Sequence, residues 1–179
     1  MSKIILITGD LATGKSTLAK NLSKKLFINC FTKDDLKEHF CDMYGYRTRE
    51  ENRQLSIKAT NFMIHTFGAF TVAGQDIILE ANFRHSEILK IKSIADQYNV
   101  DVRLIVLRGD LKVLYDRFMK RLPTRHIAHK SLHLDESFEK FSGYVLEQRK
   151  EELEYIPTII DSTKHNEQEV LELALKVCK

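Results

Sequence analysis

Short runs of hydrophobic residues alternate along this chain with longer stretches in which hydrophobic residues recur every three or four positions. The short runs predict buried β-strands, and the longer stretches predict amphipathic helices that pack on a sheet. The expected strands are residues 4–8, 27–31, 76–80, 102–107 and 158–161. The expected helices are residues 15–26, 34–44, 49–73, 86–98, 111–122, 137–155 and 167–177. This alternation predicts an α/β fold with a parallel sheet that is flanked by helices.

The alternation continues through the 179 residues without an internal repeat, a low-complexity tract or a linker. Because one domain typically contains ~100–200 residues, we expect a single domain, residues 1–179. Hydrophobic residues make up 43% and charged residues 30% of the sequence, which suits a packed core with a soluble surface. These proportions exclude a disordered tail and a coiled-coil rod.

No hydrophobic run approaches the ~18 residues of a membrane span. The first run leads into Gly9 and Asp10 instead of a signal-peptide cleavage site. Three cysteines without paired spacing indicate neither a disulfide framework nor a zinc ribbon. The sequence therefore predicts a cytoplasmic protein with no membrane partner.

Residues 9–16 carry the motif that points most directly to chemistry. They fit G-x-x-x-x-G-K-[ST], and they lie between an expected strand and an expected helix. Glycines let successive backbone N–H groups point at phosphate oxygens, and the following helix adds the positive end of its dipole. Lys15 is expected to reach the β- and γ-phosphates of ATP, and the Ser16 hydroxyl to bind Mg²⁺. The predicted nucleotide-binding residues are Gly9, Asp10, Leu11, Ala12, Thr13, Gly14, Lys15, Ser16 and Thr17.

The alternative interpretation of this segment is a glycine-containing turn that happens to precede a helix, and the match at four fixed positions disfavours it. A GTPase would also need an Asn-Lys-x-Asp motif, and a transporter ATPase would need Leu-Ser-Gly-Gly-Gln; the sequence has neither. The motif therefore favours a small kinase.

Positive charge is concentrated in residues 108–130, where seven lysines and arginines accompany two acidic residues. This segment is therefore expected to meet an anion. Its histidines, His126 and His129, and the nearby His133 lack the carboxylate or thiol spacing of a closed zinc site. We interpret them as lid or surface residues.

Three further blocks follow the phosphate-binding loop, at residues 32–37, 77–83 and 116–129. Together with residues 4–16 they resemble, in order and spacing, P-loop kinases of the group that includes polynucleotide 5′-kinases, zeta-toxin-like kinases and AAA-type small kinases. The resemblance implies a three-layer fold with a five-stranded parallel sheet of order 2-3-1-4-5 and a short lid at about residues 117–133. The chain lacks the Asp-x-Asp and Gly-Gly-Gly of shikimate kinases and the Lys-Gly-Thr of adenylate kinases, so those two families are disfavoured.

The resemblance also implies roles for side chains outside the loop. Asp34 falls where related enzymes place the carboxylate that accepts the proton of the acceptor hydroxyl, just past the second strand at the carboxyl edge of the sheet. Its alternative role is that of a helix cap or of an acid in the first turn of the following helix. Residues expected to contact or orient the acceptor or the magnesium ion are Lys37, Glu80, Asn82 and Arg125. For Lys37 and Glu80, the alternatives are an exposed lysine and a solvent-facing carboxylate.

Arg117 and Arg121 are expected to lie at the lid and clamp the phosphates of the nucleotide, because a guanidinium stays charged and offers forked donors. The alternative is a solvated cationic helix face. With Lys15 and Asp34, these two arginines complete the predicted catalytic set.

The sequence thus predicts an ATP- and Mg²⁺-dependent phosphotransferase that moves the γ-phosphate to a hydroxyl of a small or nucleoside-like acceptor. The alternatives are a polynucleotide 5′-hydroxyl kinase and a nucleotide-binding regulatory ATPase without transfer. A nucleic-acid acceptor is not favoured, because the chain has no tryptophan and the cationic segment holds only Tyr115 and Phe118 as aromatic residues. The sequence sets neither the acceptor nor the oligomeric state.

Overall fold

The computed structural model describes residues 2–129 and 133–178, in which five strands and seven helices follow one another along the chain. The strands are β1 (Lys3–Gly9), β2 (Asn29–Thr32), β3 (Ile77–Glu80), β4 (Asp101–Arg108) and β5 (Thr158–Asp161). The helices are α1 (Lys15–Leu26), α2 (Lys33–Tyr44), α3 (Arg49–Val72), α4 (His85–Tyr98), α5 (Leu111–Arg121), α6 (Phe138–Gln148) and α7 (Glu167–Cys178). Two 3₁₀ turns, η1 (Leu122–Thr124) and η2 (Ile127–His129), follow α5.

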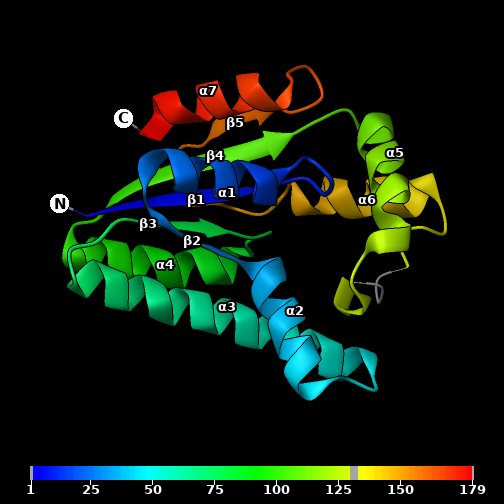
Figure 1. The fold of residues 1–179 in the computed structure, drawn as a ribbon, viewed down its shortest axis with the longest axis horizontal. Helices are drawn as coiled ribbons and strands as arrows, with labels where there is room; N and C mark the ends of the chain where they lie inside the picture. Colours follow the sequence, from blue (N-terminus) through cyan, green and yellow to red (C-terminus); the bar gives the residue numbers. More distant parts are fainter. Residues whose placement is uncertain (1, 130–132, 179) are drawn as a thin grey trace.

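The strands form one parallel sheet of order β2-β3-β1-β4-β5, which confirms the predicted fold class (Figure 1). Ile4 and Leu6 of β1 pack with α3 and α4 on one face, where Figure 1 shows these two helices side by side. Ile5 and Ile7 pack with α1 and α7 on the other face. Because both faces of the sheet are covered, its central strands are continuous hydrophobic runs, as in other parallel sheets.

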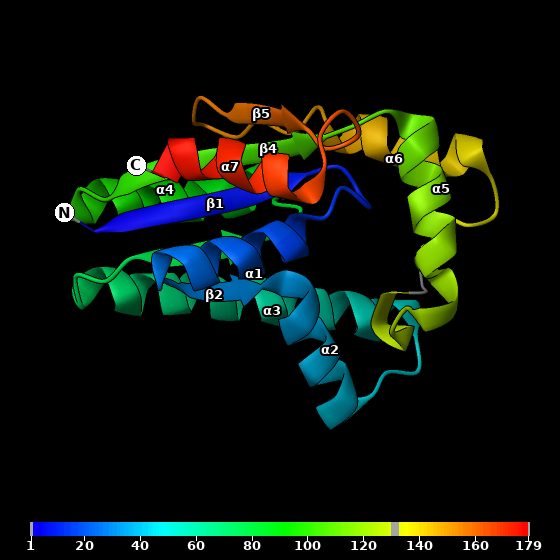
Figure 2. The same cartoon turned by 45° about the horizontal axis from the view of Figure 1, so that its top comes forward.

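The register of the sheet brings the chemistry-bearing ends of three strands together. Ile7 of β1 lies beside Glu80 of β3, and Glu80 lies beside Thr32 of β2. The loop after β1 and the start of α2 therefore meet at one edge of the sheet. Figure 2 shows α2, α5 and the 3₁₀ turns at this same end of the molecule, beyond the carboxyl ends of the strands.

Two predicted elements differ from the structure by more than one residue at an end. The helix expected over residues 137–155 ends at Gln148, because the next residues turn to make tertiary contacts: Arg149 binds Asp10, and Glu151 accepts hydrogen bonds from the start of α4. The strand expected over residues 27–31 begins at Asn29, because Phe27 ends α1 in a left-handed conformation and is 95% exposed.

Within the two described ranges, no helix combines the length and the apolar character needed to cross a membrane.

Candidate active site

The loop between β1 and α1 has the backbone that its glycines were expected to provide. Gly9 has a φ of +125°, and a Cβ there would stand 2.0 Å from the carbonyl oxygen of Leu107 in β4. Gly14 has a φ of +86° and immediately precedes α1. Only glycine adopts both positions without strain, so the loop curls tightly and directs the start of α1 toward its concave side.

Lys15 and Glu80 are two buried groups of opposite charge beneath this loop. The Lys15 ammonium donates to the backbone carbonyl of Asp10 at 2.6 Å, and burial lowers its pKa while Glu80 opposes that shift. The Glu80 carboxylate accepts a hydrogen bond from the Ser16 hydroxyl at 2.9 Å, and burial raises its pKa to about 7. A hydroxyl and a carboxylate at one buried point are oxygen donors of the type that Mg²⁺ prefers, so Ser16 and Glu80 fit a magnesium ion.

The Asp10 side chain makes contacts with distant segments of the chain. Its carboxylate is buried on the far side of the loop, where it accepts bonds from Arg149 (Nη2, 2.6 Å) and from the Gly109 amide (3.1 Å). Neither Gly9 nor Asp10 lines the cavity described next, whereas the other seven predicted nucleotide-binding residues, 11–17, all do. Arg149 was not anticipated, because it lies 139 positions from Asp10 and no local pattern links them.

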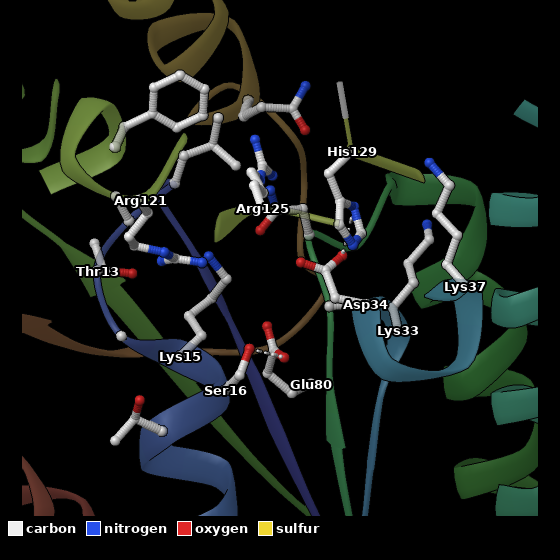
Figure 3. Close-up of a pocket in the computed structure, with 18 of the residues that line it drawn as sticks. Thr13, Lys15, Ser16, Lys33, Asp34, Lys37, Glu80, Arg121, Arg125 and His129 are labelled. Carbon is white, nitrogen blue, oxygen red and sulfur yellow. Dashed lines mark hydrogen bonds and ion pairs between the residues drawn. The ribbon is translucent and has the colours of Figure 1, made fainter. Parts of the chain in front are cut away.

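A cavity of about 1350 Å³ extends from the loop to α2 and α3 (Figure 3). It is lined by all the predicted residues outside the loop: Asp34, Lys37, Glu80, Asn82, Arg117, Arg121 and Arg125. In Figure 3, Lys15 and Asp34 point into it from opposite sides, and Glu80 lies between them at its base. The predicted site residues outside the loop therefore all line the same cavity.

Asp34 is not the cap of α2. Thr32 occupies that position, and its hydroxyl oxygen accepts a hydrogen bond from the amide of Asp35 at 3.2 Å. The Asp34 carboxylate is consequently available to the cavity, where 54% of the side chain is exposed. The cap position is thus taken by another residue, while Asp34 lies in the first turn of α2, as the alternative interpretation also allowed.

The three arginines of the cationic segment have different surroundings. Arg117 donates through Nη2 to the carbonyl oxygen of Ser162 at 3.1 Å, which ties it to the loop after β5. Arg121 extends toward Lys15 (Figure 3). The turn η1 then redirects the chain, so that Arg125 lies beside Asp34 and stacks over the ring of Phe118, 5.1 Å from its centroid.

At the other end of the cavity, Lys37 joins three segments of the chain. Its buried ammonium donates to Asn52 Oδ1 and to the carbonyl oxygen of Ala128, each at 2.7 Å. Asn52 donates to the same carbonyl at 3.0 Å. Burial lowers the pKa of Lys37, and the nearby Asp34 carboxylate opposes that shift. Two of the three N–H donors of Lys37 thus hold η2 against α2 and α3. The sequence predicted a contact with the acceptor and not this structural role.

Histidines add to this attachment of η2. His129 Nε2 lies 2.9 Å from Glu38, and its Nδ1 lies 3.9 Å from the Asp34 carboxylate. His126 Nε2 lies 3.0 Å from Asp42. The part of the expected lid at residues 126–129 is therefore packed on α2, and residues 130–132 lie outside the described residues.

Comparison with known proteins gives a family and a fold. A family model described as an AAA domain matches residues 5–155. None of the curated proteins matches the chain. Among solved structures, a proposed kinase from Chloroflexus aurantiacus j-10-fl has a TM-score of 0.82 at 22% identity, over 99% of each chain.

Two further structures share the fold at lower similarity. A gluconokinase from Sinorhizobium meliloti 1021 has a TM-score of 0.61 at 16% identity, over 97% of this chain and 90% of its own. A shikimate kinase from Aquifex aeolicus has a TM-score of 0.64 at 13% identity, over 97% and 94%. At these identities the likeness concerns the fold, and the narrower resemblance to polynucleotide 5′-kinases and zeta-toxin-like kinases stays a prediction.

Proposed function

The chain belongs to the AAA domain family, and from that premise we propose that it is a kinase that transfers the γ-phosphate of ATP to a hydroxyl group of a small molecule. One observation carries the proposal. Lys15, which follows the phosphate-binding loop, and Asp34, at the start of α2, face one cavity from opposite sides (Figure 3). A protein that only binds ATP needs the first of these groups but has no use for a carboxylate opposite it.

The loop end of the cavity suits the triphosphate. Residues 11–17 offer backbone N–H groups and the start of α1, and Lys15 adds a buried positive charge. Arg117 and Arg121 line the same region and are proposed to contact the phosphates. Ser16 and Glu80 would hold Mg²⁺, which would neutralise part of the phosphate charge.

The proposed transfer forms one bond and breaks one. The acceptor oxygen bonds to the γ-phosphorus, and the bond from that phosphorus to the oxygen that bridges it to ADP breaks. The hydroxyl proton passes to the Asp34 carboxylate, which acts as the general base. Lys15 and Arg121 balance the negative charge that develops on the transferred group. The products are ADP and a phosphate monoester.

A small acceptor is favoured over a polynucleotide. The structural neighbours include a gluconokinase, a shikimate kinase and a sugar kinase, whose names refer to small molecules. Of the described residues, Phe118, Tyr144, His129 and His165 supply the rings that line the cavity, and Phe118 and the His129 side chain are only 5% and 7% exposed. The lining thus offers little surface on which successive bases could stack, as single-strand binders require.

The test measures ADP release with Mg·ATP and a panel of sugars, sugar acids, polyols, nucleosides and a 5′-hydroxyl oligonucleotide, with products identified by ³¹P NMR. A small acceptor should stimulate ADP release and yield a phosphate monoester in equal amount. Phosphorylation of the oligonucleotide alone would favour the polynucleotide kinase. Release of ADP and inorganic phosphate that no acceptor stimulates would favour the regulatory ATPase and contradict the proposal.

A further inference from the structure

We propose that the acceptor carries a carboxylate or phosphate group near the hydroxyl that is phosphorylated, and that Arg125 binds this anionic group. The inference rests on the proposed kinase function and narrows its substrate class. It concerns the acceptor end of the cavity, which we define as the cavity-lining residues 33–57, 84–87, 125 and 129.

The acceptor end has an excess of positive charge. Its cations are Lys33, Lys37, Arg49, Arg53, Arg84 and Arg125, and its acids are Asp34, Glu50 and Glu87. A concave surface lined by one sign of charge concentrates ligands of the opposite sign. An acidic acceptor would offset part of this excess, whereas a neutral sugar or polyol would not.

Most of these cations already have partners in the protein. Lys33 lies 3.3 Å from Glu87, and Lys37 donates to two protein oxygens. Arg53 pairs with Glu50, and Arg84 pairs with Glu151, each at 2.8 Å. These contacts leave two arginines whose guanidinium groups have no hydrogen bond or ion pair among the described residues, Arg49 and Arg125.

Arg125 is the better placed of the two. Arg49 is exposed at the first residue of α3, whereas Arg125 is half-buried and stacks on Phe118, which holds its guanidinium in place. Burial also lowers its pKa, although the Asp34 carboxylate opposes that shift. Among the described residues, the half-buried guanidinium of Arg125 has no hydrogen-bond partner. Its N–H groups can donate two parallel hydrogen bonds, a geometry that matches the two oxygens of a carboxylate or the oxygens of a phosphate.

The position of Arg125 relates the anionic group to the reacting hydroxyl. Figure 3 shows Arg125 on the Asp34 side of the cavity, while Arg121 extends toward Lys15 at the loop end. The two arginines thus serve different ends of the cavity. A molecule whose hydroxyl reaches Asp34 has its neighbouring substituent close to Arg125, so the anionic group and the hydroxyl belong to one small molecule.

The experiment measures equilibrium binding to the full chain saturated with Mg²⁺ and a non-hydrolysable ATP analogue, so that the phosphate-binding loop is occupied. The probes are two sets with matched skeletons: glycerol, glycerate and glycerol 3-phosphate, and glucose, gluconate and glucose 6-phosphate. In at least one set the anionic members should bind about tenfold or more tightly than the neutral one, the preference expected from a charge-assisted hydrogen bond. Comparing carboxylate with phosphate identifies which anion the site takes.

Arg125→Gln should reduce that preference to less than about threefold, and Arg125→Lys should retain part of it, because lysine keeps the charge but not the fork. Lys90→Gln, which removes an exposed charge from α4 outside the cavity, should retain all of it. Equal or undetectable binding of every acid by the wild-type chain, or an undiminished preference in a folded Arg125→Gln variant, overturns the inference.

Binding and transfer separate this inference from the proposed function. If acids bind through Arg125 but no acceptor is ever phosphorylated, the kinase proposal fails and the anion site stands. If neutral alcohols are phosphorylated as readily as acids, the kinase proposal stands and the anion site is wrong. Phosphorylation confined to a 5′-hydroxyl oligonucleotide would also contradict the proposed anion site for a small acceptor, since the acceptor would then be a polymer.

Discussion

The two ends of the cavity are built in different ways. At the loop end, the phosphate-binding residues 11–17 form one short segment whose internal bonds are local: Thr13 and Lys15 both donate to the carbonyl oxygen of Asp10. At the acceptor end, Lys37 reaches Ala128 across 91 positions of sequence, and His129 reaches Glu38 across the same distance. The loop end can therefore be recognised from a sequence motif. The acceptor end is formed by residues that are far apart in the sequence, so no motif identifies it.

The largest effect is expected from Lys15→Ala at the loop end. The substitution removes the buried cation that is proposed to face the β- and γ-phosphates, so kcat/KM should fall about 10³-fold and nucleotide affinity should also weaken. Steady-state kinetics and nucleotide titration measure the two effects. Lys24→Ala, which changes an exposed lysine in the last turn of the same helix, should change neither. Full activity in the Lys15 variant would refute the phosphate-binding assignment.

The loop end nevertheless also depends on distant contacts, among them the ion pair between Asp10 and Arg149. Arg149→Ala would leave the Asp10 carboxylate buried, with the Gly109 amide as its remaining described donor. Breaking a fully buried ion pair costs ~3–5 kcal/mol, and we expect about 3 kcal/mol here because a quarter of the Arg149 side chain is exposed. Chemical denaturation measures the loss. Lys150→Ala is the control, since its exposed partner is Glu147. Equal stability in the two variants would show that the loop is held locally.

The sequence predicted most of the fold because the sheet is covered on both faces. Continuous hydrophobic runs such as that of β1 identify buried strands without reference to distant residues, and the strand at Thr158–Asp161 has the predicted bounds. Helix ends were less predictable. The helix α6 stops at Gln148 because the following side chains bind residues on other elements, which leaves no signal in the local pattern.

The burial of Glu80 at the floor of the loop end should make stability depend on pH. Its pKa is raised from 4.5 to about 7, so between these values the folded chain binds more protons than the unfolded chain. The free energy of unfolding should therefore fall as pH rises through this window, by up to about 3 kcal/mol at ~1.4 kcal/mol per pH unit. Chemical denaturation at a series of pH values from 4.5 to 7.5, without nucleotide and in the presence of EDTA, measures this fall in the free energy of unfolding. Glu80→Gln should remove this part of the slope, and an identical slope would show that Glu80 ionises normally.

Asp34→Asn tests the acceptor end. The amide keeps the shape of the side chain but cannot accept the proton, so kcat should fall about 10²-fold while nucleotide affinity is retained. The matched control is Asp35→Asn, because Asp35 is adjacent, exposed and paired with Lys20 at 2.8 Å. Acceptor-dependent kinetics and nucleotide titration measure both variants. A similar small loss in the two would remove Asp34 from the mechanism and support the regulatory ATPase.

Part of the candidate site was predictable for a geometric reason. Asp34 comes just after β2 and Glu80 is the last residue of β3, and the carboxyl ends of these neighbouring parallel strands meet at one edge of the sheet. The roles of Lys37 and His129 were not predictable, because their partners come from segments about 90 positions away and depend on how η2 packs. The same reason explains why the acceptor could not be identified from a motif.

The smallest effect is expected from Lys37→Met, which separates a structural role from acceptor binding. Methionine has a similar length but cannot donate to Asn52 Oδ1 or to the Ala128 carbonyl, so the free energy of unfolding should fall by about 1–2 kcal/mol. Lys90→Met, on the exposed face of α4, should leave stability unchanged.

Kinetics decide between the two roles of Lys37. If its ammonium mainly holds η2 against α2 and α3, the KM for the acceptor should change by less than about threefold at a temperature where the variant is fully folded. If it binds the acceptor directly, that KM should rise about tenfold or more, as expected when a charged hydrogen-bond partner is lost. The second outcome would mean that the acceptor displaces a contact made within the protein, because two of the three Lys37 donors are already used. Acceptor binding and the packing of η2 would then be coupled through this one side chain.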